Sequence, residues 1–463
     1  MTPPRRQLGF SITAAIVVAN MIGTGVFTST GLQARALHDP PTILLAWAVG
    51  GLLALCGAAT YAELGSMMPK AGGEYVYLRE AYHPAVGFMS GWVSLTAGFS
   101  APIAVSALAF SSYLARLVPA VASDATWLAL SLDLGGHHVF AVALGVQQAI
   151  AIGLIVVITA LHSFDAKLGG WVQAGFTAAK VMLIVGFIAC GLLVGHGDWH
   201  NLHSQHGGLA NAATGSFALA LMYVSFSYSG WNAAAYVAGE VVRPDRTLPR
   251  ALLASTGAVM ALYVLLNLVF LYAVPSDTLA GAGGSGPIIE VGDAAARRLF
   301  GDRAGQLVTS VIALALVSAV SAMVMAGPRV YAAMAADRAL PRQLGFHSRR
   351  GVPTVAVVVQ GALGVLFVVV GDLGELVRFV GFTLALFAAL TVGALFVLRR
   401  RGLRAPYRTF GYPVTPLLFI ALSGWIACAQ LAEHPTESLV VVAVLAVGGV
   451  LYGLFGRGEP HAP

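Results

Sequence analysis

Charged residues are scarce in this chain. Only 10% of its 463 residues are Asp, Glu, Lys or Arg, 58% are hydrophobic, and the mean hydropathy is +0.81. Soluble globular domains carry about 25% charged residues, because their surfaces must stay hydrated. The composition therefore excludes a soluble domain as the main body of the chain and predicts a protein that crosses the membrane several times.

Cysteine is also sparse. The three cysteines, Cys56, Cys190 and Cys428, all lie inside apolar segments. A structural disulfide between loops cannot form there, so we interpret all three as small residues of a membrane core.

Groups that enzymes and metal sites need are missing from the apolar segments. An intramembrane enzyme requires a nucleophile with its base, or a pair of carboxylates, and neither occurs at membrane depth. Four histidines share one loop with Asp198, Asn201 and Gly207, which favours solvated loop residues over metal ligands. The sequence predicts no enzyme, no cofactor and no metal. These histidines are His196, His200, His203 and His206.

Twelve apolar stretches are long enough to cross about 30 Å of hydrocarbon. They predict an all-α integral membrane protein with 12 transmembrane helices. The stretches are 8–36, 42–66, 84–118, 139–161, 168–195, 212–240, 250–274, 304–335, 353–371, 374–398, 412–431 and 437–456.

Basic residues are distributed unevenly among the loops. With the N-terminus in the cytoplasm, most Lys and Arg fall in inner loops, including the run Arg399 to Arg401. The positive-inside rule then places both termini in the cytoplasm. The net charge of +6 follows from this asymmetry and suits the anionic lipids of an inner leaflet.

Small and polar residues interrupt two of the stretches. The first interruption runs from Asn20 to Phe27 and the second from Phe226 to Asn232, which includes Gly230. Because glycine favours unwinding, and unpaired backbone groups are tolerated at membrane depth only beside a cavity or ligand, the two breaks predict a site for a small polar solute.

The spacing of the breaks predicts an internal repeat. They fall in segments 1 and 6, and an odd number of spans per unit inserts the second unit upside down. We therefore expect two inverted five-helix repeats, 8–195 and 212–398, followed by two additional helices in 412–456.

The ends of an interrupted helix suit a zwitterion. A resuming helix presents free amides for a carboxylate, and an ending helix presents carbonyls for an ammonium group. The alternative is that the glycines merely allow close helix packing. The carboxylate candidates are Gly23, Thr24 and Gly25, and the ammonium candidates are Ile22 and the carbonyls of Phe226, Ser227 and Ser229.

Lys180 lies about 18 Å along the fifth segment. An ammonium group at that depth costs at least about 2.5–3.5 kcal/mol. It can snorkel or pair structurally, but a functional role is favoured, either as a proton acceptor or as a fixed charge where a cation would bind.

Five ordered motifs resemble the amino acid-polyamine-organocation superfamily, and especially its L-type amino acid transporter branch. The resemblance extends from about Leu8 to the final helices. Its motifs are the first break, Pro69–Ala81, Phe226–Asn232 with Gly239 and Glu240, Gly327–Ala335 and Ala405–Pro413.

The resemblance implies a LeuT-like fold and a secondary transporter that works by alternating access. It assigns substrate carboxylate binding to Gly23, Thr24 and Gly25, and a lid role to Phe226. Lys180 occupies the place where sodium-coupled relatives hold sodium, which implies sodium-independent transport. Proton symport and amino acid exchange both remain open.

The absence of charged residues at membrane depth restricts the class of substrate that we expect. The membrane-depth parts of segments 1, 3, 6, 8 and 10 lack Asp and Glu, and a central Arg is missing too, so neutral L-amino acids are expected. Ser229 stands where the family often has glycine, which favours small substrates. A cationic amino acid or polyamine exchanger is the alternative, and a membrane sensor without net flux is the alternative from another class.

The same resemblance also allows a prediction about partner subunits. Heteromeric members use a cysteine between segments 3 and 4 to link an accessory subunit, and residues 119–139 contain none. We therefore expect a bacterial-type transporter of the inner membrane, with lipid around it, no nucleic acid and no disulfide-linked subunit.

Overall fold

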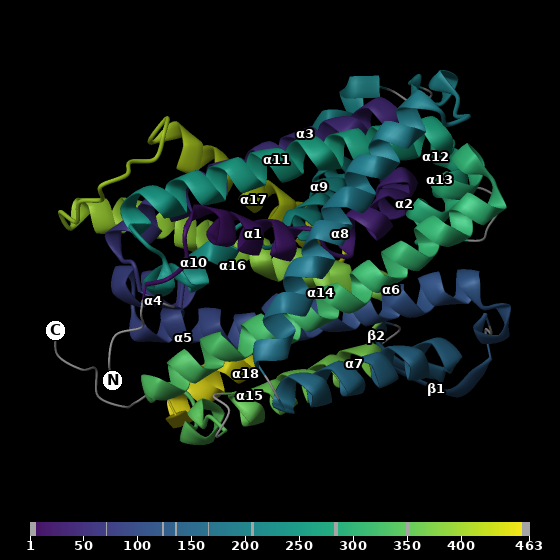
Figure 1. Cartoon of the computed structure of the whole chain (residues 1–463). Coiled ribbons are helices and arrows are strands. Elements are labelled where there is room, and N and C mark those ends of the chain that lie inside the picture. Colours follow the sequence, from purple (N-terminus) through teal and green to yellow (C-terminus); the bar gives the residue numbers. More distant parts are fainter. Residues whose placement is uncertain are drawn as a thin grey trace.

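The computed structural model describes residues 6–70, 72–122, 125–134, 137–164, 166–204, 208–281, 286–348 and 352–455. Ala71 of the motif after the second segment and His206 of the histidine loop lie outside them. Within the described residues, the chain forms a bundle of long helices (Figure 1).

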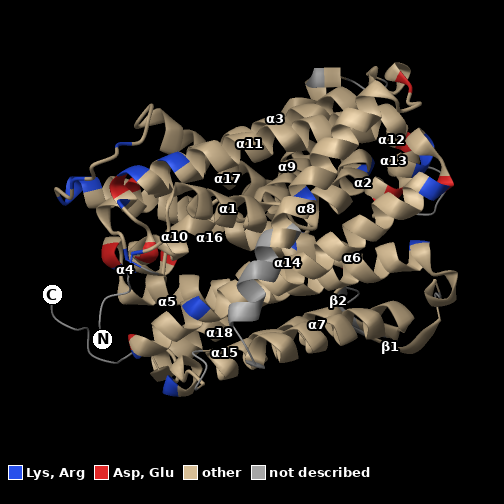
Figure 2. Ribbon diagram, viewed as in Figure 1, with Lys and Arg blue, Asp and Glu red and all other residues tan. Residues whose placement is uncertain are grey.

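Charged residues gather toward the two ends of this bundle, and its middle is largely uncharged (Figure 2). In the part of the chain that the structure describes, 9 helices are long and apolar enough to cross a membrane, and shorter apolar helices occupy Thr177–Leu193, Gly215–Tyr228 and Thr354–Val370. The chain is therefore a multi-pass membrane protein, while the number of twelve spans stays a prediction.

The first half of the chain contains the first interruption and a stretch of π-helix in the third segment. A π-helix adds a residue to the turn and often marks a functional part of a helix. The elements are α1 (Phe10–Met21), α2 (Gly25–Leu37), α3 (Pro40–Met67), α4 (Glu74–Ala81), α5 (Pro84–Val93), η1 (Ser94–Ser100), α6 (Ala101–Leu117), η2 (Pro119–Val121), β1 (Thr126–Leu134), β2 (His137–Gly145), α7 (Val146–Phe164) and α8 (Ala166–Leu193).

The second half contains the second interruption, and its longer helices follow the predicted segments within a few residues. Its elements are η3 (Trp199–Leu202), η4 (Gly208–Ala213), α9 (Gly215–Tyr228), α10 (Ala233–Tyr236), η5 (Ala238–Glu240), α11 (Pro244–Ala273), α12 (Ser276–Leu279), α13 (Val291–Phe300), α14 (Asp302–Ala336), η6 (Arg342–Gly345), α15 (Thr354–Val370), α16 (Leu373–Arg400), α17 (Val414–Glu433) and α18 (Pro435–Phe455).

One predicted boundary is wrong. The fourth segment was expected to be helical from residue 139, but β1 and β2 pair there as an antiparallel hairpin, with Leu130 opposite Val142, and α7 begins only at Val146. Short apolar runs do not distinguish strand from helix, and this run can complete its backbone hydrogen bonds with the complementary run before it. The hairpin is the exception to the all-α fold.

Local sequence explains where several helices begin. Asp39 precedes Pro40 and Pro41, and its carboxylate accepts a hydrogen bond from the Thr42 amide at 3.2 Å. Proline suits the first helical position, because its missing N–H needs no partner there. These residues fix the start of α3 and therefore the length of the loop that follows the first interrupted segment.

Helices from both halves of the chain pack against the interrupted segments. α2 packs against α9, α1 packs against α11, and α6 packs against α14. α11 also packs along α3 (Figure 1). The two breaks are thus surrounded by helices from both halves of the chain.

The residues before α1 are joined to those after α10. The amides of Gln7 and Leu8 donate to the Glu240 carbonyl at 2.8 and 3.0 Å, and the Val242 amide donates to the Leu8 carbonyl at 2.9 Å. Leu8 and Val241 form a parallel bridge. Backbone hydrogen bonds therefore connect the two interrupted segments outside their breaks.

Candidate functional site

The first interruption spans Ile22 to Thr24. α1 ends at Met21 and α2 begins at Gly25. The Tyr263 hydroxyl donates to the Met21 carbonyl at 2.6 Å, and the Lys180 ammonium group donates to the Ile22 carbonyl at 3.1 Å. Protein donors thus occupy the carbonyl side of this break.

The amide side of the first break remains available. The amides of Thr24 and Gly25 donate to no carbonyl of the described chain, because the start of a helix leaves its first amides without partners. The Gly23 amide, by contrast, donates to the Met21 carbonyl at 2.8 Å, and the Phe27 amide donates to the Thr24 carbonyl at 3.0 Å. The Thr24 hydroxyl forms a hydrogen bond of 2.6 Å with the Ser106 hydroxyl of α6. Free amides and the positive end of the helix dipole suit an anionic group.

The second interruption runs from Ser229 to Asn232. The Ser229 amide donates back to the Phe226 carbonyl at 3.0 Å, which closes the end of α9. Gly230 follows with a φ of 95°, a left-handed conformation that favours glycine. Within the described chain, the carbonyls of Ser227 and Ser229 accept no hydrogen bond across the break.

The two breaks pack directly against each other. A Cβ atom on Gly25 would lie 2.5 Å from the Ser227 Cα, and one on Gly230 would lie 2.7 Å from the Asn20 carbonyl group. The Ser227 hydroxyl also donates to the Ser29 hydroxyl at 3.0 Å. Close packing therefore explains Gly25 and Gly230.

Gly23 differs from those two glycines. A Cβ atom there would meet only the Met21 carbonyl oxygen, at 3.9 Å. Packing does not require glycine at this position. The missing side chain instead leaves the backbone of the first break open to the neighbouring space.

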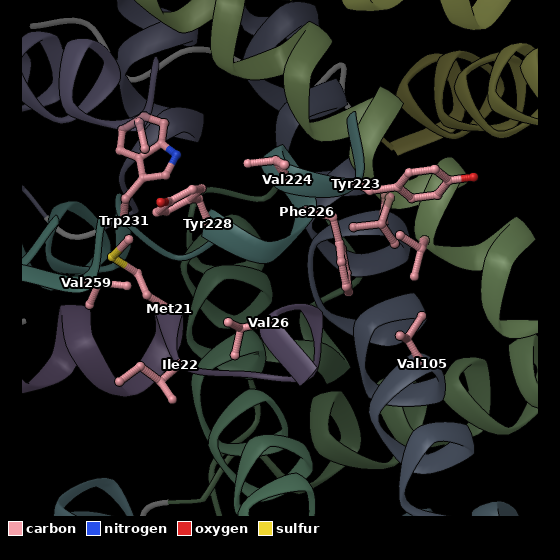
Figure 3. Packing of buried hydrophobic residues seen from close by; sticks show 14 of the residues in the cluster. Met21, Ile22, Val26, Val105, Tyr223, Val224, Phe226, Tyr228, Trp231 and Val259 are labelled. Atoms are coloured by element: carbon pink, nitrogen blue, oxygen red, sulfur yellow. The ribbon is translucent and has the colours of Figure 1, made fainter. Parts of the chain in front are cut away.

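A cavity of about 40 Å³ lies between the breaks. Its volume corresponds to little more than one water molecule, so an amino-acid-sized solute requires the surrounding helices or side chains to move. Figure 3 shows the Phe226 side chain extending from α9 toward Val26 of α2 and Val105 of α6. The cavity is lined by Ala19, Asn20, Met21, Gly23, Thr24, Gly25, Pro102, Ser106, Phe226, Ser227, Ser229, Ala319, Ala322 and Met323.

Most predicted site residues meet at this cavity. Ile22 and Gly230 do not line it: the Ile22 carbonyl binds Lys180, and Gly230 supports the packing of the two breaks. Lys180 does not line the cavity either, and it contacts the first break through the Ile22 carbonyl. The predicted residues that line the cavity are Gly23, Thr24, Gly25, Phe226, Ser227 and Ser229.

Sequence reasoning missed the contributions of α6 and α14. Ser106 of α6 bonds to Thr24, and Ala319, Ala322 and Met323 of α14 also line the cavity. A serine in an apolar helix is a weak signal, because α6 also contains Ser111 and Ser112. Alanine and methionine in a membrane helix carry no signal at all.

Lys180 is almost completely enclosed. Its side chain is 1% exposed, and no carboxylate of the described chain lies within 4.0 Å of its ammonium nitrogen. The Ile22 carbonyl is its one hydrogen-bond partner among these residues. A positive charge or a proton-accepting amine thus stands directly behind the first break.

The architecture and the cavity define a multi-pass membrane protein with a small polar site at two interrupted helices. Residues 8–452 match the family described as Amino acid permease. The match covers nearly the whole chain, and the protein belongs to this family. It is therefore a transporter rather than an enzyme, as its sequence predicts.

Curated relatives extend over the same length. The serine/threonine exchanger SteT of Bacillus subtilis is 28% identical over 459 residues, which cover 98% of each chain. The human b(0,+)-type amino acid transporter 1 is 28% identical over 464 residues, covering 98% of this chain and 88% of the relative. The human large neutral amino acids transporter small subunit 2 is 27% identical, with coverages of 98% and 82%.

Proposed function

We propose that this protein is a sodium-independent secondary transporter of small neutral L-amino acids that works by exchange. One observation carries the proposal. The first break presents free amides and the second presents free carbonyls, and both face one cavity. An α-amino acid has a carboxylate and an ammonium group that match these two ends.

The binding mode follows from the hydrogen bonds that remain unused. The substrate carboxylate binds the amides at Thr24 and Gly25, with the Thr24 hydroxyl as a further donor. The substrate ammonium group binds the carbonyls of Ser227 and Ser229. Ile22 contributes indirectly, because its carbonyl holds Lys180.

The cavity lining supports a neutral, small side chain. Among its described residues there is no Asp, Glu, Lys or Arg, so a charged side chain would be buried without a partner. Ser229 and Met323 limit the space beside the breaks. This composition disfavours the cationic amino acid or polyamine alternative.

Exchange is supported by a relative whose name describes a serine/threonine exchanger. Lys180 supports sodium independence, because its ammonium group already supplies a cation beside the first break. We further propose that Phe226 covers the substrate during alternating access, since its ring borders the cavity.

Topology and partnership complete the proposal. The equivalent breaks in segments 1 and 6 support two inverted repeats, 8–195 and 212–398, with two further helices in 412–456. The excess of Lys and Arg in alternate loops supports cytoplasmic termini in a bacterial inner membrane. The absence of cysteine from residues 119–139 supports transport without a disulfide-linked subunit.

The test is transport by the purified protein in proteoliposomes. Vesicles loaded with unlabelled serine, alanine, leucine, arginine or glutamate, or with no amino acid, receive labelled substrates with and without sodium and proton gradients. We expect uptake of small neutral amino acids only against a loaded amino acid, independent of sodium. Uptake into empty vesicles driven by a proton gradient would overturn exchange, and binding without flux would indicate a sensor.

A further inference from the structure

A buried carboxyl group lies next to the second break but takes no part in the proposed binding mode. Glu74 is the first residue of α4, outside the membrane-spanning helices, and it is only 6% exposed. Gly73 precedes it with a φ of 51°, and a Cβ atom on Gly73 would lie 2.7 Å from the Tyr236 ring. This close contact places the Glu74 side chain in the protein interior, next to the second break.

Two hydrogen bonds connect Glu74 to the interrupted segment and to α3. The Tyr61 hydroxyl donates to Glu74 Oε1 at 2.6 Å, and the Asn232 amide nitrogen donates to the same oxygen at 2.8 Å. Within the described chain, Oε2 receives no hydrogen bond. The carboxyl group therefore has one oxygen bound to the break and one oxygen that can carry a proton.

Few charges surround this carboxyl group. The titratable side chains that face it are the phenols Tyr61 from α3, Tyr77 from α4 and Tyr236 from α10. Arg399 of α16 is engaged with the Glu63 carboxylate at 2.7 Å. No Lys or Arg of the described residues lies within 4.0 Å of Glu74.

Nearby basic residues are directed elsewhere. Arg79, on the same helix as Glu74, pairs with Asp337 at 2.6 Å and with Glu80 at 3.2 Å. α5, which packs against α4, contains no titratable residue. Glu74 is thus a buried acid without a compensating cation in the described part of the chain, a situation that disfavours its charged form.

A cavity of about 60 Å³ adjoins Glu74. Ser229 and Asn232 of the second break also line it. Two further lining hydroxyls, those of Ser225 and Ser423, are buried without a hydrogen-bond partner in the described chain. The volume suits about two water molecules, which would satisfy these hydroxyls and could exchange a proton with the acid.

We propose that Glu74 is a proton-binding site that controls the movement of the second break. The carboxyl group holds a proton in the conformation described here. It releases the proton to water when the break moves and the α4 region becomes hydrated. In that step the carboxyl O–H bond breaks, water takes the proton, and the carboxylate keeps its negative charge. This inference rests on the proposed transport function, whose rate it would regulate.

The pH dependence has a definite sign. Burial raises the pKa of Glu74, and the hydrogen bonds from Tyr61 and Asn232 oppose this effect in part. The described conformation therefore binds the proton more tightly than a hydrated conformation does. Acid favours the described conformation, and rising pH favours the hydrated one, until Glu74 is deprotonated in both.

The first experiment detects the proton directly and does not depend on transport. Infrared difference spectra of the purified full-length protein are recorded between acid and alkaline pH. The expected result is a protonated-carboxyl band that titrates above the ordinary range of glutamate and disappears in Glu74→Gln. A spectrum in which Glu74→Gln removes no such band would overturn the proposal.

The second experiment measures exchange in proteoliposomes with equal pH on both sides. We expect the parent rate to change with pH in the range where the band titrates, and Glu74→Gln to be flat there. Glu80→Gln, at an exposed position on the same helix, is the matched control and should keep the parent profile. A Glu74→Gln profile equal to that of the parent would overturn the proposal.

Tyr61→Phe provides an independent variant if Glu74→Gln folds poorly. It removes one donor to the charged carboxylate, so the infrared midpoint should rise by about one pH unit. A purely structural role of Tyr61 would leave the midpoint unchanged and would count against the site. An absence of amino acid flux in the parent would reject the proposed function, while the infrared result would still decide whether Glu74 binds the proton.

Discussion

The two interruptions look alike in sequence but differ in what they leave unused. At the first break, Tyr263 and Lys180 donate to the carbonyls of Met21 and Ile22, while the amides of Thr24 and Gly25 remain without acceptors from the described chain. At the second, the carbonyls of Ser227 and Ser229 remain without donors from the described chain. One break is therefore suited to an anion and the other to a cation, and together they have the polarity of an amino acid.

The glycines show the same contrast on a smaller scale. Gly25 and Gly230 allow the breaks to touch, whereas a Cβ atom on Gly23 would meet only the Met21 carbonyl oxygen, at 3.9 Å. Glycine thus has two separate uses within three residues of the first break. Both interpretations of the Gly-x-Gly pattern, close packing and backbone access, apply to this protein at different positions.

The largest expected effect comes from Gly25→Ala. The new Cβ atom would clash with the Ser227 backbone, and overpacking of this kind costs about 1–3 kcal/mol. We expect a lower yield of monodisperse protein in size-exclusion chromatography and no measurable exchange. Gly23→Ala is the matched control: it should elute as the parent does but exchange poorly, because its methyl group would point into open space at the break. Equal folding defects in both variants would contradict the distinction.

The next largest effect is expected from Lys180→Met. Loss of the charge-assisted hydrogen bond to Ile22 should cost about 1.5–3 kcal/mol, or roughly tenfold or more in transport rate. Lys180→Ala should also alter the pH dependence of uptake. Initial rates across acid to mildly alkaline pH measure both effects. Arg329→Met, at an exposed position of α14, should match the parent. An unchanged pH profile in Lys180→Ala would dismiss Lys180 as a coupling group.

Phe226→Ala tests the wall that the second break contributes to the cavity. Without the ring, the substrate is occluded less well, and we expect its apparent affinity to fall about tenfold, which corresponds to ~1.4 kcal/mol. Phe226→Leu should restore much of this affinity, because it keeps an apolar cover. Concentration-dependent exchange is the measurement. Parent-like affinity in Phe226→Ala would argue against the lid role.

The smallest effect is expected from Ser229→Gly. Removing this side chain from the lining widens the cavity without removing the carbonyl that we assign to the ammonium group. Relative rates for leucine over alanine should rise a few-fold, which is less than the roughly 1–3 kcal/mol that one methylene in a well-fitted pocket contributes to discrimination. Competition assays in proteoliposomes compare the two substrates. A selectivity identical to that of the parent would remove Ser229 from the size filter.

Sequence alone predicted the broad fold and the positions of both breaks. Long apolar runs have few solutions in lipid, and Gly23, Gly25 and Gly230 mark the places where helices stop. The amide and carbonyl roles that we propose also rest on chain direction, because a helix always ends in carbonyls and resumes with amides. These features depend on local sequence and on the bilayer.

The missed features depend on tertiary contacts. Nothing near Tyr263 indicates that its hydroxyl reaches the Met21 carbonyl, and nothing near Ser106 indicates that it bonds to Thr24. The sequence shows Glu74 only as part of a motif after the second segment, because its burial depends on the contact between Gly73 and Tyr236. The hairpin before α7 was missed because strand pairing is a property of two runs rather than one.

The short backbone pairing between Leu8 and Val241 has a mechanical consequence. Because these hydrogen bonds join the residues before α1 to the residues after α10, a movement of the start of α1 should also move the segment that follows α10. In the proposed binding mode, the carboxylate and the ammonium group of the substrate would therefore be released together, and neither charge would remain in the bilayer without a partner.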